Sequence, residues 1–269
     1  MIDRQWAEHA AETLERLRER APLVHNITNY VAMDLAANAL NALGASPVMA
    51  HAEEEAGEFA EQAAALTINI GTLSTPWIKG IKAAVQAAME SDTPWVFDPV
   101  GVGATRYRNE IAEALSGLSP AVIRANASEV QALAGLGDGG KGVDSTADTD
   151  DAIEAAKELA TRLDTVVLMT GVRDIATNGE TTMAVDHGHE LMGRITASGC
   201  ALTALCGAFL AVEPEPLAAA VAAATCFGLA GDLAAMDAEG PGSFRVSLLD
   251  QLYALEPDIV AERGTIKPL

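Results

Sequence analysis

The chain alternates short apolar runs with longer segments of helical periodicity, and this alternation restricts the possible folds more than any other feature. The runs are rich in β-branched residues and end at Gly, Pro or Asn, as buried strands do. Strands are predicted at 22–28, 46–50, 66–71, 94–100, 121–127 and 165–171, and helices between them at 29–43, 52–64, 76–90, 107–117, 128–135 and 150–163. This order predicts an α/β fold, with a mostly parallel central sheet flanked by helices on both faces.

The second half of the chain departs from this alternation. Segment 181–196 predicts two short strands around His187-Gly188, which would form an antiparallel hairpin at one edge of the sheet. Two helices of small residues are then expected at about 199–212 and 215–236. Residues 135–151 are rich in Gly and Asp and predict a surface loop.

Composition and charge exclude several classes of protein. The net charge of −21 argues against nucleic-acid binding, because a protein that binds nucleic acid needs a basic surface. Acidic residues spread along the chain are typical of a salt-rich cytoplasm, although an ordinary acidic enzyme remains an alternative. The apolar segment 216–236 is interrupted by Gly228, Gly231 and Asp232, so no membrane span is expected. The amphipathic helix expected at 1–21 has no signal-peptide core.

Three cysteines without CxxC spacing indicate a reduced, cytoplasmic protein. Cys206 and Cys226 fall deep in apolar helical patterns and are expected to be buried and inert. No linker or internal repeat divides the chain, so residues 1–269 are expected to form a single domain.

Polar residues follow several of the predicted strands, where ligands collect in a parallel sheet. Asp98 closes the strand in "FDPVGVGA" and suits a metal-bound phosphate, or else caps the Pro turn after it. In "RANASE", Arg124 at a strand end can take phosphate oxygens, Asn126 beside it is expected to help bind the ATP, and Glu129 suits a hydrated Mg²⁺. The same Asn and Glu would equally form a capping box at a helix start.

Two further motifs suit a nucleotide. Thr170-Gly171 ends the strand in "LMTGVRDIATNG", where a nucleotide could lie close to the backbone, although an ordinary strand-to-turn junction explains it as well. "TASGC" places the amides of Ala197, Ser198 and Gly199 before an apolar helix, which predicts an anion hole for a transferring phosphoryl group. Cys200 at this helix start is expected to have a lowered pKa, and would act as a base or hold an acceptor hydroxyl; a buried, inert cysteine is the alternative.

These motifs occur together in a known family. "PLVHNITNYVAMDLAANALNALGASPVMAHAEEEA", "NIGTL", "DPVGVGATRYR", "AVIRANASE", "GKGVDS", "TGVRDIATNG", "SGC" and "EGPGSF" stand in the order seen in hydroxyethylthiazole kinases, from about residue 22 to residue 250. The resemblance implies a ribokinase-like three-layer fold and ATP-dependent phosphorylation of 4-methyl-5-(2-hydroxyethyl)thiazole at its primary alcohol. It also implies a step of thiamine salvage, Mg²⁺, and a homotrimer with shared active sites.

The resemblance also assigns roles. It implies that Arg124 and Thr170 contact ATP, and that Asp98 and Glu129 hold magnesium and phosphate. It further implies that the thiazole site is lined by Asn29, Val31, Met49, Gly71 and Ala197. Met49 alone would be taken for a core methionine, and its thioether also suits a flat ring. His25 could orient this loop, or be an ordinary core histidine, and Lys141 is expected in a solvated loop.

The chain departs from the family at one position of the anion hole. The family reads Gly-Thr-Gly-Cys or Gly-Ala-Gly-Cys where this chain has Ala197-Ser198-Gly199-Cys200. If the turn needs a positive φ at the first position, Ala197 strains it by roughly 1 kcal/mol. Rival activities are hydroxymethylpyrimidine kinase, the ATP-dependent dehydratase of hydrated nicotinamide cofactors, and a non-catalytic thiazole or nucleotide sensor. The first two favour Asp at position 200, and "VHNITN" fits neither.

Overall fold

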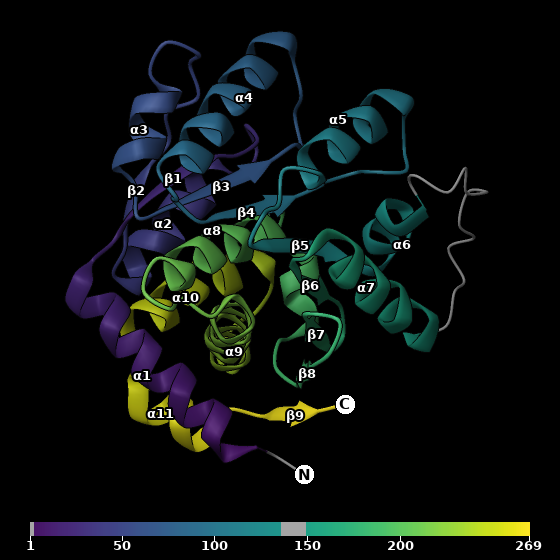
Figure 1. Cartoon of the computed structure of the whole chain (residues 1–269). Helices are drawn as coiled ribbons and strands as arrows, with labels where there is room; N and C mark the ends of the chain where they lie inside the picture. Colours follow the sequence, from purple (N-terminus) through teal and green to yellow (C-terminus); the bar gives the residue numbers. More distant parts are fainter. Residues whose placement is uncertain (1–2, 136–148) are drawn as a thin grey trace.

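A computed structural model describes residues 3–135 and 149–269 and has the predicted three-layer α/β architecture (Figure 1). Within these residues, one nine-stranded sheet has the order β2-β1-β3-β4-β5-β6-β7-β8-β9. The strands are β1 Leu23–Ile27, β2 Ser46–Val48, β3 Ala65–Asn69, β4 Trp95–Asp98, β5 Val122–Asn126, β6 Val166–Thr170, β7 Asp174–Thr177, β8 Thr182–Val185 and β9 Ile266–Pro268. Strands β1 to β6 pair in parallel, whereas β7, β8 and β9 are antiparallel additions. All six strands predicted from apolar runs are confirmed.

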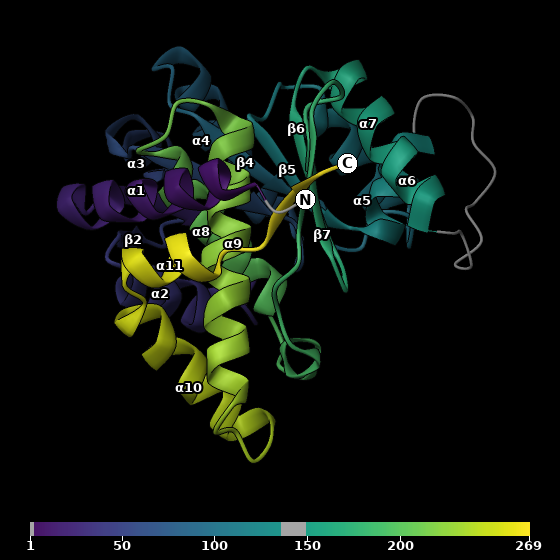
Figure 2. The ribbon, with the colours of Figure 1, turned by 90° about the horizontal axis from the view of Figure 1, so that it is seen from below.

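Helices cover both faces of this sheet (Figure 2). One face packs on α3 Ala56–Gln62, α4 Thr75–Glu90, α5 Arg106–Ser116, α6 Ala127–Gly135 and α7 Thr149–Leu163. The other packs on α1 Arg4–Arg20, α2 Met33–Leu43, α8 Ser198–Leu210, α9 Pro216–Ala235, α10 Pro241–Ala254 and α11 Pro257–Arg263. Each face therefore has its own apolar core, as expected for a parallel sheet.

Small residues let α8 and α9 pack closely on the sheet. A Cβ on Gly207 of α8 would lie 2.5 Å from Thr67 Cγ2 of β3, so only glycine allows this approach. In the described part of the chain, α9 alone is long and apolar enough to cross a membrane, but 89% of its apolar 18-residue window is buried inside the protein. It is a core helix, and it runs through the centre of its layer in Figure 1.

The predicted hairpin lies earlier in the chain than expected. Its strands are β7 and β8, and its turn is Asn178-Gly179 instead of His187-Gly188. Asn178 Oδ1 accepts hydrogen bonds from the N–H groups of Glu180 and Thr181, and Gly179 has φ +94°, so local turn chemistry decides the position. His187-Gly188 instead leads into the 3₁₀ helix η1 Glu190–Arg194.

The C-terminal segment adds α10, α11 and β9, which were not predicted from the sequence. The Asp3 N–H donates to the Ile266 carbonyl, so the two ends of the chain lie together. Both edge strands contain a proline, Pro47 in β2 and Pro268 in β9. Helix α6 ends at Gly135 and α7 begins at Thr149; Lys141 and most of the predicted loop lie outside the described residues.

Candidate active site

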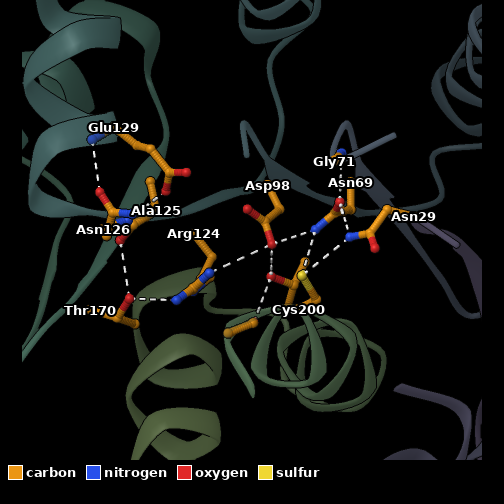
Figure 3. Close-up of polar contacts among 12 residues, drawn as sticks. Asn29, Asn69, Gly71, Asp98, Arg124, Ala125, Asn126, Glu129, Thr170 and Cys200 are labelled. Atoms are coloured by element: carbon orange, nitrogen blue, oxygen red, sulfur yellow. Dashed lines mark hydrogen bonds and ion pairs between the residues drawn. The ribbon is translucent and has the colours of Figure 1, made fainter. Parts of the chain in front are cut away.

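The carboxyl ends of five parallel strands meet the start of α8, and this is where the predicted site residues gather (Figure 3). The strands β1, β3, β4, β5 and β6 end at or just before Asn29, Asn69, Asp98, Asn126 and Thr170. Cys200 faces this row from the first turn of α8. The structure therefore brings most of the predicted residues together.

The start of α8 has the backbone that an anion hole requires. Ala197 precedes the helix with φ 70° and ψ 13°, and its side chain does not cap the helix. The amides of Ser198, Gly199 and Cys200 lie in the first helical turn, where four N–H groups have no partner within the helix. A Cβ on Gly199 would lie 2.4 Å from Arg124 Nη2, so glycine is required for the guanidinium to rest against this turn.

Because Ala197 has the positive φ considered above, Ala197→Gly is expected to stabilise the protein by up to about 1 kcal/mol. Relief of left-handed strain, about 1–2 kcal/mol, exceeds the extra flexibility of glycine in the unfolded chain, about 0.4–1 kcal/mol. Urea unfolding measures the difference. Ala201→Gly in the body of α8 is the matched control and is expected to lose about 1 kcal/mol. An equal loss in both variants would contradict strain at Ala197.

Asp98 is a fully buried carboxylate with one oxygen bonded and one free. Its Oδ2 accepts hydrogen bonds from Asn69 Nδ2 and Thr203 Oγ1, both at 2.7 Å, and lies 3.6 Å from Arg124 Nη1. Its Oδ1 is buried without a partner. Burial raises the pKa of Asp98 to about 6, although the Arg124 charge lowers it. The alternative of a carboxylate capping the following Pro turn does not hold.

Arg124 connects Asp98 to the end of β6. Its Nη2 donates to Thr170 Oγ1 at 2.5 Å, and its Nε is buried without a partner. Arg124 lies within β5, two residues before the strand ends, and not at the strand end as expected. The strand still directs the guanidinium to the carboxyl edge, between Thr170 and Asp98 (Figure 3).

Asn126 and Glu129 form the capping box that the sequence left open as an alternative. Glu129 N–H donates to Asn126 Oδ1 at 2.9 Å, and Asn126 N–H donates to Glu129 Oε2 at 3.0 Å. The other carboxylate oxygen of Glu129 accepts from Gly101 N–H at 2.8 Å. Glu129 therefore ties the loop after β4 to the start of α6, and its magnesium role remains a prediction.

The expectation of a lowered thiol pKa at Cys200 is wrong. Burial and the Asp98 charge raise the pKa of Cys200, and they outweigh Arg124 and the hydrogen bonds from Asn29 and Asn69. The helix-start position was identified correctly, but the depth of the thiol depends on tertiary packing. Burial also raises the pKa values of Cys206 and Cys226 to about 12, which confirms them as inert core cysteines.

The residues predicted for a thiazole site are only partly together. Asn29 Nδ2 lies 3.4 Å from Cys200 Sγ, and a Cβ on Gly71 would lie 2.6 Å from Asn29 Nδ2. The Val31 N–H donates to Asn29 Oδ1, but its side chain is 60% exposed. Met49 is half-buried just after β2, at the edge of the sheet. The buried His25 donates from Nε2 to the Ala50 carbonyl and so holds the segment after Met49.

A cavity of about 420 Å³ opens beside Arg124, which is large enough for a small-molecule ligand. Its lining includes Arg124, Thr170, Ser198 and Gly199, and also the apolar side chains of Leu202 and Phe227. Asp174 lines it as well; burial raises the pKa of this carboxyl to about 6. The cavity therefore joins the predicted phosphate-binding groups to an apolar wall.

The model of the hydroxyethylthiazole kinase family matches residues 14–258 of this chain. The chain belongs to this family. A hydroxyethylthiazole kinase from Rhizobium etli is 51% identical over 254 residues, 94% of this chain and 98% of the relative. One from Desulforudis audaxviator is 49% identical over 260 residues, with 96% and 95% coverage.

Solved structures agree with this assignment. The hydroxyethylthiazole kinase of Pyrococcus horikoshii has a TM-score of 0.90 at 42% identity, covering 97% of this chain and 98% of that one. The pyridoxal kinase of Bacillus subtilis has a TM-score of 0.57 at 18% identity, covering 77% and 90%, and shows the fold alone. The ribokinase-like fold expected from the resemblance is therefore confirmed.

Sequence reasoning missed two residues in the site of this hydroxyethylthiazole kinase family member. Asn69, at the end of β3, contacts Asp98, Cys200, Asn29 and Gly71. Arg108 donates to the carbonyls of Ile70, Gly71 and Val100 at 2.6–2.7 Å, and so joins the loops after β3 and β4. The available signals were a polar residue inside the apolar run "LTINIG" and an arginine in the glycine-rich motif after Asp98.

Proposed function

We propose that the protein transfers the γ-phosphoryl group of ATP to the primary alcohol of 4-methyl-5-(2-hydroxyethyl)thiazole, as a step of thiamine salvage. One observation carries the proposal: Arg124 and the start of α8, at Ser198 and Gly199, line the same cavity, and Cys200 follows in the same helical turn. Such a site offers donors to a triphosphate and to the charge that develops on a transferring phosphoryl group. The names of the relatives supply the thiazole alcohol as the acceptor.

In the reaction, the alcohol oxygen bonds to the γ-phosphorus while the bond from this phosphorus to the β-phosphate oxygen breaks. ADP leaves, and the alcohol proton is released. Arg124 and Thr170 are proposed to bind the phosphates, and the amides of residues 197–200 to stabilise the transferring group. Asn29, Gly71 and Cys200 are proposed to place the alcohol, with Met49, Val31 and Ala197 around the thiazole ring. Asn126 holds Glu129 in position through the capping box.

The site fits Mg²⁺ as the partner of the phosphates. Asp98 Oδ1 is a buried oxygen with no partner, and a kinase magnesium site needs only one or two carboxylates besides the phosphates. Among the described residues, no group of three or more His, Cys, Asp or Glu side chains could hold a metal ion. Asp98 and Glu129 would hold the ion. When bound, the ion neutralises charge on the phosphates.

A coupled assay of ADP release tests the proposed function. ADP release is expected with ATP, Mg²⁺ and the thiazole alcohol, and not with 4,5-dimethylthiazole, which lacks the hydroxyl group. Hydroxymethylpyrimidine and hydrated NADH separate the rival activities. Binding of the thiazole without ADP release would favour a sensor and refute the kinase.

Cys200→Ala is expected to retain turnover, with kcat lowered about 10-fold or less. Phosphoryl transfer through a loose transition state depends on positioning more than on early proton removal, and the raised thiol pKa makes Cys200 a poor base at neutral pH. Initial rates of ADP release measure the effect, with Cys206→Ala as the matched control. Complete loss of turnover with unchanged thiazole binding would show that the thiol is indispensable.

We also propose a homotrimer built from single-domain chains, with active sites completed by neighbouring subunits. Tyr30 is 65% exposed and Val31 is 60% exposed, although both directly follow Asn29 in the loop after β1. Apolar side chains exposed beside a site mark a surface that a partner covers. The single sheet running from β2 to β9 supports the one-domain organisation of residues 1–269.

The acidic surface is proposed to suit a salt-rich cytoplasm. At a net charge of −21, self-repulsion is screened when the Debye length falls from about 30 Å in dilute buffer to about 3 Å at 1 M salt. The Tm is therefore expected to rise between dilute buffer and about 1 M KCl, with most of the rise at the lower salt concentrations, where the Debye length shortens most. A flat Tm in KCl would indicate an ordinary acidic enzyme.

A further inference from the structure

Asn69 occupies the centre of the polar cluster at the carboxyl edge of the sheet. It ends β3, is only 2% exposed, and lies between Asp98 on β4 and Asn29 after β1 (Figure 3). Its Nδ2 donates to Asp98 Oδ2 at 2.7 Å and to Cys200 Sγ at 3.3 Å. Its Oδ1 accepts from Gly71 N–H and from Asn29 Nδ2, both at 2.9 Å. Every donor and acceptor of this amide is in use.

Backbone groups fix the orientation of both amides in the cluster. The Gly71 N–H can only donate, so the Asn69 atom that faces it must be the oxygen. The N–H groups of Val31 and Ala32 both point at Asn29 Oδ1 at 3.0 Å, which fixes the Asn29 amide independently. The atoms of Asn29 and Asn69 that face Cys200 are therefore both NH₂ groups.

This orientation determines how Cys200 can act. Its Sγ accepts one hydrogen bond from Asn29 Nδ2 and one from Asn69 Nδ2, so both acceptor directions of the sulfur are filled. Burial and the Asp98 charge keep the group a neutral thiol. The S–H is then the one group that Cys200 can still offer, and it can donate to the oxygen of a bound alcohol.

The same amide determines how Asp98 can act. Asn69 and Thr203 together occupy Asp98 Oδ2, and Oδ1 remains without a partner. Rotation of the carboxylate would break two hydrogen bonds of 2.7 Å. Asn69 therefore holds Asp98 with one oxygen committed to the protein and the other available.

We propose that Asn69 is the positioning residue of the site, which holds Cys200 as a hydrogen-bond donor to the acceptor alcohol and leaves Asp98 Oδ1 free. The inference rests on the proposed function, and it adds that the thiol donates to the alcohol and does not take its proton. Asn69 itself is saturated by protein groups, so it acts through these neighbours.

Steady-state kinetics of Asn69→Ala against Asn26→Ala test the positioning role. Asn26 is a buried amide on the adjacent strand β1, and its hydrogen bonds go to Thr67 Oγ1 and the Val24 carbonyl instead of Cys200, so both variants lose one buried amide from the same sheet. Asn69→Ala is expected to lower kcat about 10²-fold, as a misplaced reacting group does, with the KM for ATP within about threefold. Asn26→Ala is expected to keep kcat within about threefold. Equal kcat values in the two variants would overturn the inference.

A spectroscopic measurement on the unliganded protein separates this inference from the proposed function. Subtracting the infrared spectrum of Cys200→Ala isolates the S–H stretch of Cys200. The band is expected at pH 7 in the unmodified protein, and it is expected to shift in Asn69→Ala, where Sγ loses a donor, and to stay in place in Asn26→Ala. A missing band, or the same band in both variants, would refute the inference even if ADP release confirms the kinase. The expected shift in a chain that releases no ADP would leave the hydrogen-bond assignment standing and the kinase refuted.

Discussion

Arg124→Ala is expected to reduce kcat/KM for ADP release by about 10³-fold or more, the range found when a charged donor to a transferring phosphoryl group is removed. Arg124 is the cation next to Asp98, it donates to Thr170, and it rests against Gly199 at the start of α8. Its loss removes a phosphate ligand and the support of the anion hole together. Stability is expected to fall less than the loss of a cation beside a buried carboxylate alone would cause. Without the Arg124 charge the pKa of Asp98 rises further, and the carboxyl then takes up a proton.

Two comparisons make the Arg124 result specific. Arg124→Lys keeps the charge but cannot bridge Thr170 and Asp98 with one planar group. This variant is therefore expected to keep only a small part of the activity that Arg124→Ala loses. Arg16→Ala removes an arginine that pairs with Glu213 at 2.6 Å outside the candidate site, and it is expected to leave kcat/KM within about threefold. Similar losses in Arg16→Ala and Arg124→Ala would show that ion-pair loss alone explains the effect.

Asp98→Asn is expected to abolish nearly all turnover, by about 10³-fold, while the protein still folds. Asparagine can present its amide oxygen to Asn69 and Thr203 in place of Oδ2, and its NH₂ then replaces the free Oδ1. The variant therefore loses the one unpaired carboxylate oxygen, which is the proposed ligand of the metal-bound phosphates. Calorimetric titration with ATP and Mg²⁺ checks that binding weakens, and near-wild-type turnover would rule out this role for Asp98.

The same variant has a pH signature. The folded pKa of Asp98, about 6, lies above the ordinary aspartate pKa of 3.8, so the folded state holds this proton to higher pH than the unfolded state does. The contribution of Asp98 to stability is therefore greatest below about pH 4 and is lost as pH rises through 6. Asp98→Asn is expected to reduce the slope of unfolding free energy against pH by up to about 1.4 kcal/mol per pH unit. The carboxyl of Asp174, whose pKa burial also raises to about 6, still contributes to the slope that remains. An unchanged slope of unfolding free energy between pH 4 and 6 would contradict the assignment.

The parallel half of the fold could be predicted because its signals are local. Strands β1 to β6 are short apolar runs that end at turn residues, and the helices between them have clear periodicity. The hairpin was misplaced because two dipeptides, Asn178-Gly179 and His187-Gly188, both suit a turn, and the stronger signal is Asn-Gly. The C-terminal elements α10, α11 and β9 carry weak patterns of their own and form where α9 and β8 offer a surface.

The site could be predicted as a set of residues but not as a hydrogen-bond network. Asp98, Thr170 and Cys200 stand at recognisable strand ends or at a helix start, and Arg124 lies two residues before a strand end, so the topology alone brings these four residues together. Burial depth and bond direction are not local. The pKa of Cys200 is therefore raised where the sequence predicted a lowered value. Asn69 could be noticed only as one polar residue in an otherwise apolar strand.

The prolines in the two edge strands have a consequence for how copies of this chain meet. Pro47 and Pro268 have no N–H to offer, so neither three-residue edge is a template on which another strand can grow. At high concentration, copies of the chain are therefore not expected to pair edge strand to edge strand and form fibres. An ordered assembly is instead expected to form through complementary side chains on helices and loops, with no sheet continuing from one subunit into the next.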